Sequence, residues 1–98
     1  MNEILFPAQY KNALANKIKN ITIRFGTELN KYKVGKIYRA QSYTGVDWAT
    51  RIKIIKIIQT SVDELKEFGI SQKSIQSLKR KHKLSSNTKV ELIKFKIL

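Results

Sequence analysis

The fold of this chain is decided by one stretch, Lys17-Ile18-Lys19-Asn20-Ile21-Thr22-Ile23-Arg24. Ile21 and Ile23 alternate with Thr22 and Arg24, and this alternation is typical of a half-buried β-strand. We expect one face of the strand to enter a core and the other to expose Thr22 and Arg24, with Lys19 just before the strand. An amine, a hydroxyl and a guanidinium on one exposed face suit a phosphate, a carboxylate or a polarised carbonyl. An ordinary solvated strand face would show the same spacing.

The chain is short and strongly basic. Its 98 residues carry a net charge of +13, from 20 Lys and Arg against 7 Asp and Glu. A small domain with this excess of positive charge is predisposed to bind a polyanion. Abundant Lys, Ile and Asn from an AT-rich genome would also explain the charge. Most of the cations are lysines, which bind phosphate as point charges and read little sequence, so we expect binding without strong sequence specificity.

Composition excludes several other classes of protein. The chain has no cysteine and therefore neither a disulfide framework nor a thiolate metal site. A lone histidine, His82, cannot form a zinc site by itself, and we expect neither a metal nor a cofactor. No apolar run reaches membrane-spanning length and no signal peptide is recognisable, so we expect a cytoplasmic protein without a membrane partner. The length suits a single domain over residues 1–98.

Periodicity and turn residues divide the chain into short elements. The expected helices cover 8–17, a short segment from Ser61 to Gly69, and 72–82, while the expected strands cover 20–25, 36–43, 49–60 and 88–98. Ser61 with Glu64, and Ser71, have the positions of helix caps. These elements predict an α+β fold, a small, mostly-β barrel with an N-terminal helix and two short mid-chain helices.

Two strands change hydrophobic phase. In the long strand 49–60 the phase changes between Ile54 and Ile55, and a β-bulge there would let the isoleucines on both sides of it point inward. A strand buried on both faces is the alternative. We expect a similar phase change between Leu92 and Ile93 in the last strand.

The order of these motifs resembles a known family. A short helix, then Lys-x-x-Thr-Ile-Arg from Lys19 to Arg24, then x-Val-Gly-x-x-Tyr ending at Tyr38, resembles the ASCH domain family of PUA-like β-barrels. The resemblance covers roughly residues 5–60 and returns in 90–98. It is closest to the small bacterial members that hydrolyse N4-acetylcytidine. It implies a PUA-like barrel, and domains of that superfold are associated with RNA.

The first functional hypothesis is a module that binds RNA or a nucleotide in a basic cleft beside the first helix. Tyr43 and Trp48 flank a turn and could stack on an unpaired base, although a large core side chain is the favoured interpretation of Trp48. Lys17 and the basic run from Lys79 to Lys83 also suit helix C-termini for structural reasons alone. The expected nucleic-acid-binding residues are Lys17, Lys19, Arg24, Tyr43, Trp48, Arg51, Lys53, Lys79 and Arg80.

The second hypothesis is an amidohydrolase that removes the acetyl group of N4-acetylcytidine. The resemblance implies a lysine, a threonine and a glutamate as catalytic groups, and the first two match Lys19 and Thr22. A desolvated lysine could activate a threonine hydroxyl for attack on the acetamide carbonyl. Glu67 is the nearest candidate for the glutamate, although Phe68 could occupy that position instead. The chain departs from the family pattern at Asn20, where a small hydroxyl residue is usual, and at Lys17-Ile18, where a glycine and a basic residue are usual.

A third hypothesis is a protein-interaction or regulatory module. A very basic small domain could bind an acidic protein surface, although no motif favours this over RNA. The sequence specifies neither the RNA nor the oligomeric state.

Overall fold

The computed structural model describes residues 3–17 and 20–98. A five-stranded sheet forms its frame, in the order β1-β3-β4-β5-β2. β1 pairs with β3 in parallel, and the other neighbours are antiparallel. The strands are β1 Glu3–Phe6, β2 Ile21–Phe25, β3 Ile37–Ser42, β4 Asp47–Ser61 and β5 Lys89–Ile97.

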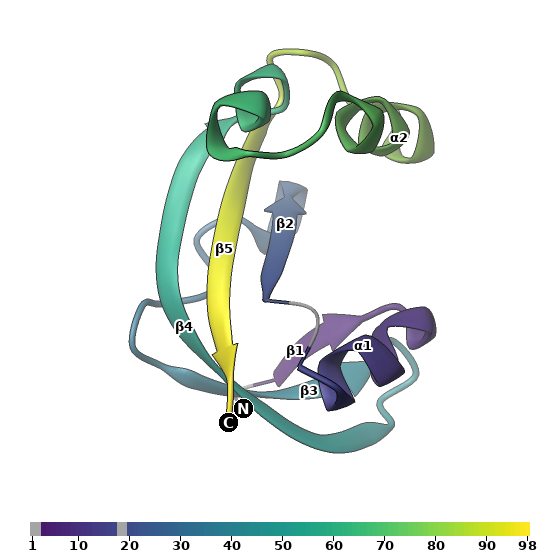
Figure 1. Ribbon diagram of the computed structural model, residues 1–98, viewed down its shortest axis with the longest axis vertical. Coiled ribbons are helices and arrows are strands. Elements are labelled where there is room, and N and C mark those ends of the chain that lie inside the picture. Colours follow the sequence, from purple (N-terminus) through teal and green to yellow (C-terminus); the bar gives the residue numbers. More distant parts are fainter. Residues whose placement is uncertain (1–2, 18–19) are drawn as a thin grey trace.

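Short helices lie at the two ends of the long, curved β4 and β5 (Figure 1). The 3-10 turn η1 (Ala8–Tyr10) and the helix α1 (Lys11–Ala15) lie near β1 and β3, whereas η3 (Asp63–Phe68) and α2 (Gln72–His82) lie at the other end. A further 3-10 turn, η2 (Gly26–Glu28), follows β2. The predicted α+β fold is confirmed, although the first helix is shorter than 8–17 and the first mid-chain helix is a 3-10 helix.

The helix caps explain where the mid-chain helices begin and end. Ser71 accepts a hydrogen bond from the Ser74 backbone N–H at 3.1 Å and caps α2, as predicted. Ser61 instead donates to Glu64 Oε1 at 2.7 Å, and η3 begins after Val62 without a side-chain cap. Gly69 ends η3 with a φ of +88°, a conformation that glycine adopts without strain.

The predicted bulge in β4 is present. The register with β5 shifts between Ile54 and Lys56, so Ile52, Ile54 and Ile57 all pack into one core. Ile55 is the extra residue and is half exposed, so the prediction that it points inward is wrong. In β5 the predicted phase change is absent, because β2 pairs with it in unbroken register from Val90 to Lys94. From Val90 to Ile93 this strand is buried on both faces.

Two hydrophobic clusters lie on the two faces of β5. Ile93 and Phe95 belong to the first cluster, which also contains residues of β1, β3, β4 and α1. Val90 and Leu92 belong to the second, which lies under η3 and α2. The continuous apolar pattern of β5 therefore reflects two cores rather than a bulge.

Candidate functional site

Thr22 and Arg24 are buried rather than exposed. Their side chains share one face of β2, as predicted, but the residues are only 7% and 6% exposed. The Arg24 guanidinium carbon lies 4.9 Å from the centre of the Phe6 ring and 5.7 Å from that of Tyr32. The prediction of a solvent-facing Thr22 and Arg24 is therefore wrong, because β1 and the segment after η2 cover this face of the strand.

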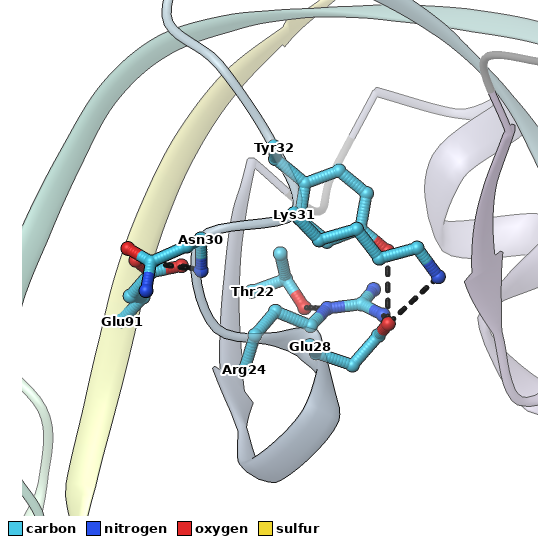
Figure 2. A network of polar contacts seen from close by, with 7 residues as sticks. All are labelled: Thr22, Arg24, Glu28, Asn30, Lys31, Tyr32 and Glu91. Atoms are coloured by element: carbon cyan, nitrogen blue, oxygen red, sulfur yellow. Dashed lines mark hydrogen bonds and ion pairs between the residues drawn. The ribbon is translucent and has the colours of Figure 1, made fainter.

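Arg24 holds a polar network together (Figure 2). Its Nε donates to Thr22 Oγ1 at 3.1 Å, and its Nη1 donates to Glu28 Oε1 at 3.0 Å. Tyr32 Oη donates to the same carboxylate oxygen at 2.8 Å, and Lys31 Nζ donates to Glu28 Oε2 at 2.8 Å. Glu28 thus receives donors from Arg24, Lys31 and Tyr32. The bond from Arg24 joins the segment 26–32 to β2, and the other two hold the segment together.

The electrostatics of this network favour an ionised Glu28. Burial alone would raise the pKa of Glu28, but hydrogen bonds from Lys31 and Tyr32 and the charges of Lys31 and Arg24 outweigh it and hold the pKa below 4.5. Burial raises the pKa of Tyr32, with an opposing effect from Arg24 and a further rise from the bond to Glu28. Because the Arg24 side chain is 7% exposed and already paired, it has little capacity to bind an external phosphate.

The region around the first helix end is only partly described. Lys19, predicted both as a catalytic and as a binding residue, lies outside the described residues. Lys17 follows α1, is exposed and has a φ of 58°. Lys17 and Asn20 line an open pocket of about 330 Å³ together with Phe95, Lys96 and Ile97 of β5. This pocket lies just after the first helix, and neither Thr22 nor Arg24 lines it.

Glu67 lies apart from the buried network. It is exposed on η3, and no hydrogen bond or ion pair among the described residues joins it to Thr22 or Arg24. The carboxylate that is linked to Thr22 through Arg24 is Glu28. Phe68, the alternative occupant of the Glu67 position, is 39% exposed.

The two candidate aromatic residues have different environments. Tyr43 is 65% exposed in the turn between β3 and β4 and is available for contact with a base. Trp48 is half-buried and packs against the first hydrophobic cluster, which matches the favoured interpretation of this residue as a core side chain.

The basic end of α2 is partly neutralised. Lys79 Nζ lies 2.6 Å from Asp63 Oδ1 and donates to Ser86 Oγ at 3.0 Å. Hydrogen bonds from Lys79 and Ser86 lower the pKa of Asp63. Arg80 is exposed and makes no ion pair among the described residues. Lys79 therefore has a structural role in joining α2 to η3, and Arg80 is the free cation of the two.

The sheet itself carries more cations than the basic end of α2. Antiparallel register places Arg39 opposite Arg51, Lys53 opposite Lys96, and Lys56 opposite Lys94. Paired residues share a face of the sheet, and the bulge at Ile55 keeps Lys56 on the same face as Lys53. Of the six side chains, only Arg39 makes an ion pair among the described residues, with Asp47 at 3.3 Å. We call this set the sheet-face cations, namely Arg39, Arg51, Lys53, Lys56, Lys94 and Lys96.

Of the sheet-face cations, the sequence predicted Arg51 and Lys53 as nucleic-acid-binding residues, and it placed Lys56 with them on an outer surface without a binding role. The alternation Lys94-Phe95-Lys96 in the sequence indicates that the two lysines of β5 lie on the face opposite Phe95. Lys56 is on this face only because of the bulge, and the pairing of Arg39 with Arg51 depends on the strand register.

The described residues offer no metal site and no membrane span. Within 3–17 and 20–98, no three His, Cys, Asp or Glu side chains gather where they could hold a metal ion. In the same part of the chain no helix combines the length and apolar character needed to cross a membrane.

Comparison with known proteins defines the class of fold. The chain is similar to the crystal structure of an ASCH domain from Lactobacillus crispatus JV V101, with a TM-score of 0.59 and 14% sequence identity. The similarity covers 89% of this chain and 69% of the other. The chain therefore has an ASCH-like fold, as its sequence motifs predicted. No protein-family model matches the chain, and no curated protein matches its sequence.

Proposed function

We propose that this chain binds RNA through the sheet-face cations. The observation that carries the proposal is the three pairs of like charges directly opposite one another on β3, β4 and β5. Like charges at opposite positions of adjacent strands destabilise a sheet, because their Cβ atoms are only about 5 Å apart. A phosphate backbone would relieve this repulsion, since each phosphate can sit between two cations. The proposed setting is the cytoplasm.

The pocket beside the first helix extends this surface. Lys96 belongs both to the sheet-face cations and to the pocket that Lys17 lines. An RNA strand on the sheet face would therefore reach the side of α1 where the sequence predicted the basic cleft. Tyr43 and Arg80 are exposed candidates for peripheral contacts, whereas the burial of Arg24 and the ion pair of Lys79 give those residues structural roles in this proposal.

Salt dependence tests the proposal. Binding of a single-stranded RNA should weaken linearly on a log–log plot of affinity against salt, with a slope of about −0.7 for each phosphate neutralised. One phosphate between the two cations of each of the three pairs would give a slope of roughly −2, and a separate phosphate for each of the six sheet-face cations would give roughly −4. Fluorescence anisotropy with a labelled oligoribonucleotide at several NaCl concentrations measures this slope. The proposal is wrong if no binding is detected even at low salt.

Amidohydrolase activity toward N4-acetylcytidine is the second candidate function. One observation favours it, because Thr22 Oγ1 and a carboxylate of low pKa are joined through Arg24 in one network. In this candidate mechanism Thr22 is the nucleophile, Lys19 activates it, and Glu28 rather than Glu67 supplies the carboxylate. The segment 26–32 would have to open, because Thr22 is buried.

Release of cytidine from N4-acetylcytidine, followed by chromatography, tests this candidate. Activity should be lost in Thr22→Ala and in Lys19→Ala and retained in Glu67→Gln. Circular dichroism of each variant checks that it is folded. Activity that depends on Glu67 would restore the original assignment, and the absence of cytidine release from the wild-type chain would remove the candidate.

A further inference from the structure

A second, larger pocket lies on the other face of the sheet. It has a volume of about 540 Å³ and opens between three segments, namely the C-terminal end of β4, the N-terminal end of β5 and the loop after η2. Gln59 and Glu91 stand opposite each other on the face that also carries Ile57 and Ile93, whereas Lys56 and Lys94 belong to the opposite face. The size falls within the range of small-molecule sites.

Glu91, which lines this pocket, is a buried carboxylate without a cation. It is 2% exposed, and no ion pair among the described residues involves it, although the chain has 20 Lys and Arg. Its partners are the Asn30 backbone N–H, at 3.3 and 3.2 Å from the two carboxylate oxygens, and Gln59 Nε2 at 3.3 Å. An ionised carboxylate can accept about four hydrogen bonds, so acceptor positions remain on both oxygens.

Arg24, the cation nearest to Glu91 in the strand pairing, forms its ion pair with Glu28 instead. Arg24 is the direct cross-strand partner of Glu91 in the pairing of β2 with β5. Its guanidinium nevertheless bonds to Glu28, which receives Lys31 as well (Figure 2). Burying a carboxylate without a cation is unfavourable unless donors reach it. Glu91 is thus left able to receive donors from a ligand.

The groups around Glu91 define which ligand fits. Asn30 Oδ1 accepts from Gln59 Nε2 at 3.2 Å, and the Asn30 Nδ2 group has no partner among the described residues. The pocket therefore presents the Asn30 amide donor beside the two oxygens of the Glu91 carboxylate. Leu29 is an apolar wall, and Glu64 and Lys89 are the charged side chains that also line the pocket. Guanine has the complementary edge, an O6 acceptor beside N1–H and N2–H donors. Cytosine and adenine present one exocyclic amine beside a ring nitrogen that accepts hydrogen bonds. This ring acceptor would face the carboxylate, which is also an acceptor, so the two would repel.

We propose that this pocket binds a guanine nucleobase, with N1–H and N2–H donating to Glu91 and O6 accepting from the Asn30 amide. The site takes the free nucleoside and does not depend on RNA binding, because the sheet-face cations lie on the other face. Its volume accommodates the ribose as well as the base.

Isothermal titration with guanosine, inosine, adenosine and cytidine tests this site. Guanosine should bind the wild-type chain, and inosine, which lacks the N2 amine, should bind about 10-fold or more weakly, since a hydrogen bond to a charged group is lost. Adenosine and cytidine should bind still more weakly than inosine. Guanosine affinity should not change with salt, because the nucleoside is uncharged. Equal affinities for guanosine and inosine, or no guanosine binding at millimolar concentration, would overturn the proposal.

Glu91→Gln provides the matched variant. It keeps the size of the side chain and removes the charge and one acceptor, so guanosine affinity should fall about 10-fold or more. Glu67→Gln, on exposed η3, makes the same chemical change outside the pocket and should bind guanosine as the wild type does. If Glu91→Gln binds guanosine normally, the site is wrong; if it fails to fold, the comparison of guanosine with inosine on the wild-type chain decides. RNA binding measured on the same samples shows separately whether the sheet-face proposal holds.

Discussion

The double substitution Lys53→Glu/Lys56→Glu should lower RNA affinity about 100-fold at low salt and at the same time stabilise the fold. Each change removes a phosphate contact and adds a repelling charge. Each also converts a like-charge pair, with Lys96 or Lys94, into an opposite-charge pair. Such cross-strand pairs contribute roughly 0.2–1 kcal/mol each, so the free energy of unfolding should rise. Anisotropy titrations and urea denaturation measure the two effects.

A control with the same change in net charge separates local contacts from overall charge. Lys66 and Lys73 are exposed on η3 and α2, away from the sheet-face cations. Lys66→Glu/Lys73→Glu should weaken RNA binding far less than the sheet-face variant does. An equal loss in both variants would mean that binding follows net charge and not this surface.

Arg24→Met should destabilise the fold by about 3 kcal/mol and leave RNA affinity unchanged when the variant is folded. This loss of stability is at the lower end of the range of roughly 3–5 kcal/mol for breaking a buried ion pair, because Glu28 keeps its bonds to Lys31 and Tyr32. Urea denaturation measures the stability, and anisotropy well below the melting temperature measures binding. A large loss of RNA affinity in the folded variant would show that Arg24 contacts RNA after all.

The pH dependence of the same variant reports on Glu28. A carboxylate whose pKa is lowered on folding contributes stability above its unfolded pKa and loses it as the pH falls through the folded value. The charge of Glu28 should therefore stabilise the wild type above a pH of about 4.5, and this contribution should disappear at lower pH. Without Arg24 the pKa is lowered less, so the loss of stability between pH 5 and pH 3 should be shallower in Arg24→Met. Parallel curves for the two proteins would contradict this account.

The sequence predicted the elements of the fold well, because their signals are local. Ser71 and Gly69 mark helix ends by their own backbone chemistry, and the bulge beside Ile54 follows from the phase of four isoleucines. The Lys-x-x-Thr-Ile-Arg motif led to the ASCH-like fold, which the structural comparison bears out.

The surroundings of Thr22 and Arg24 could not be predicted from alternation. The pattern of β2 separates two faces but does not say which one is covered, and Ile21 and Ile23 are in fact only half-buried. Arg24 is buried because Phe6, Glu28 and Tyr32, which lie outside the strand, fold over it. The spacing of Arg24 and Glu28, four residues apart, is the one feature of the sequence that indicates an ion pair between them.

The sheet-face cations depended on register, which is a non-local property. Arg39 and Arg51 are distant in sequence, as are Lys53 and Lys96, and only strand pairing brings them together. The same applies to Asn30, Gln59 and Glu91, whose contacts span up to 61 residues.

The strand order also has a consequence for biosynthesis. β2 is made early, yet its partner in the sheet is β5, the last of the five strands of this sheet to be synthesised. Until Lys89–Ile97 emerges, β2 and the C-terminal part of β4 each lack the strand with which they pair. Such long-range closure slows folding and leaves open strand edges on the nascent chain. We therefore expect the five-stranded sheet to be completed only after synthesis of β5, with nascent chains that lack β5 prone to pair with one another.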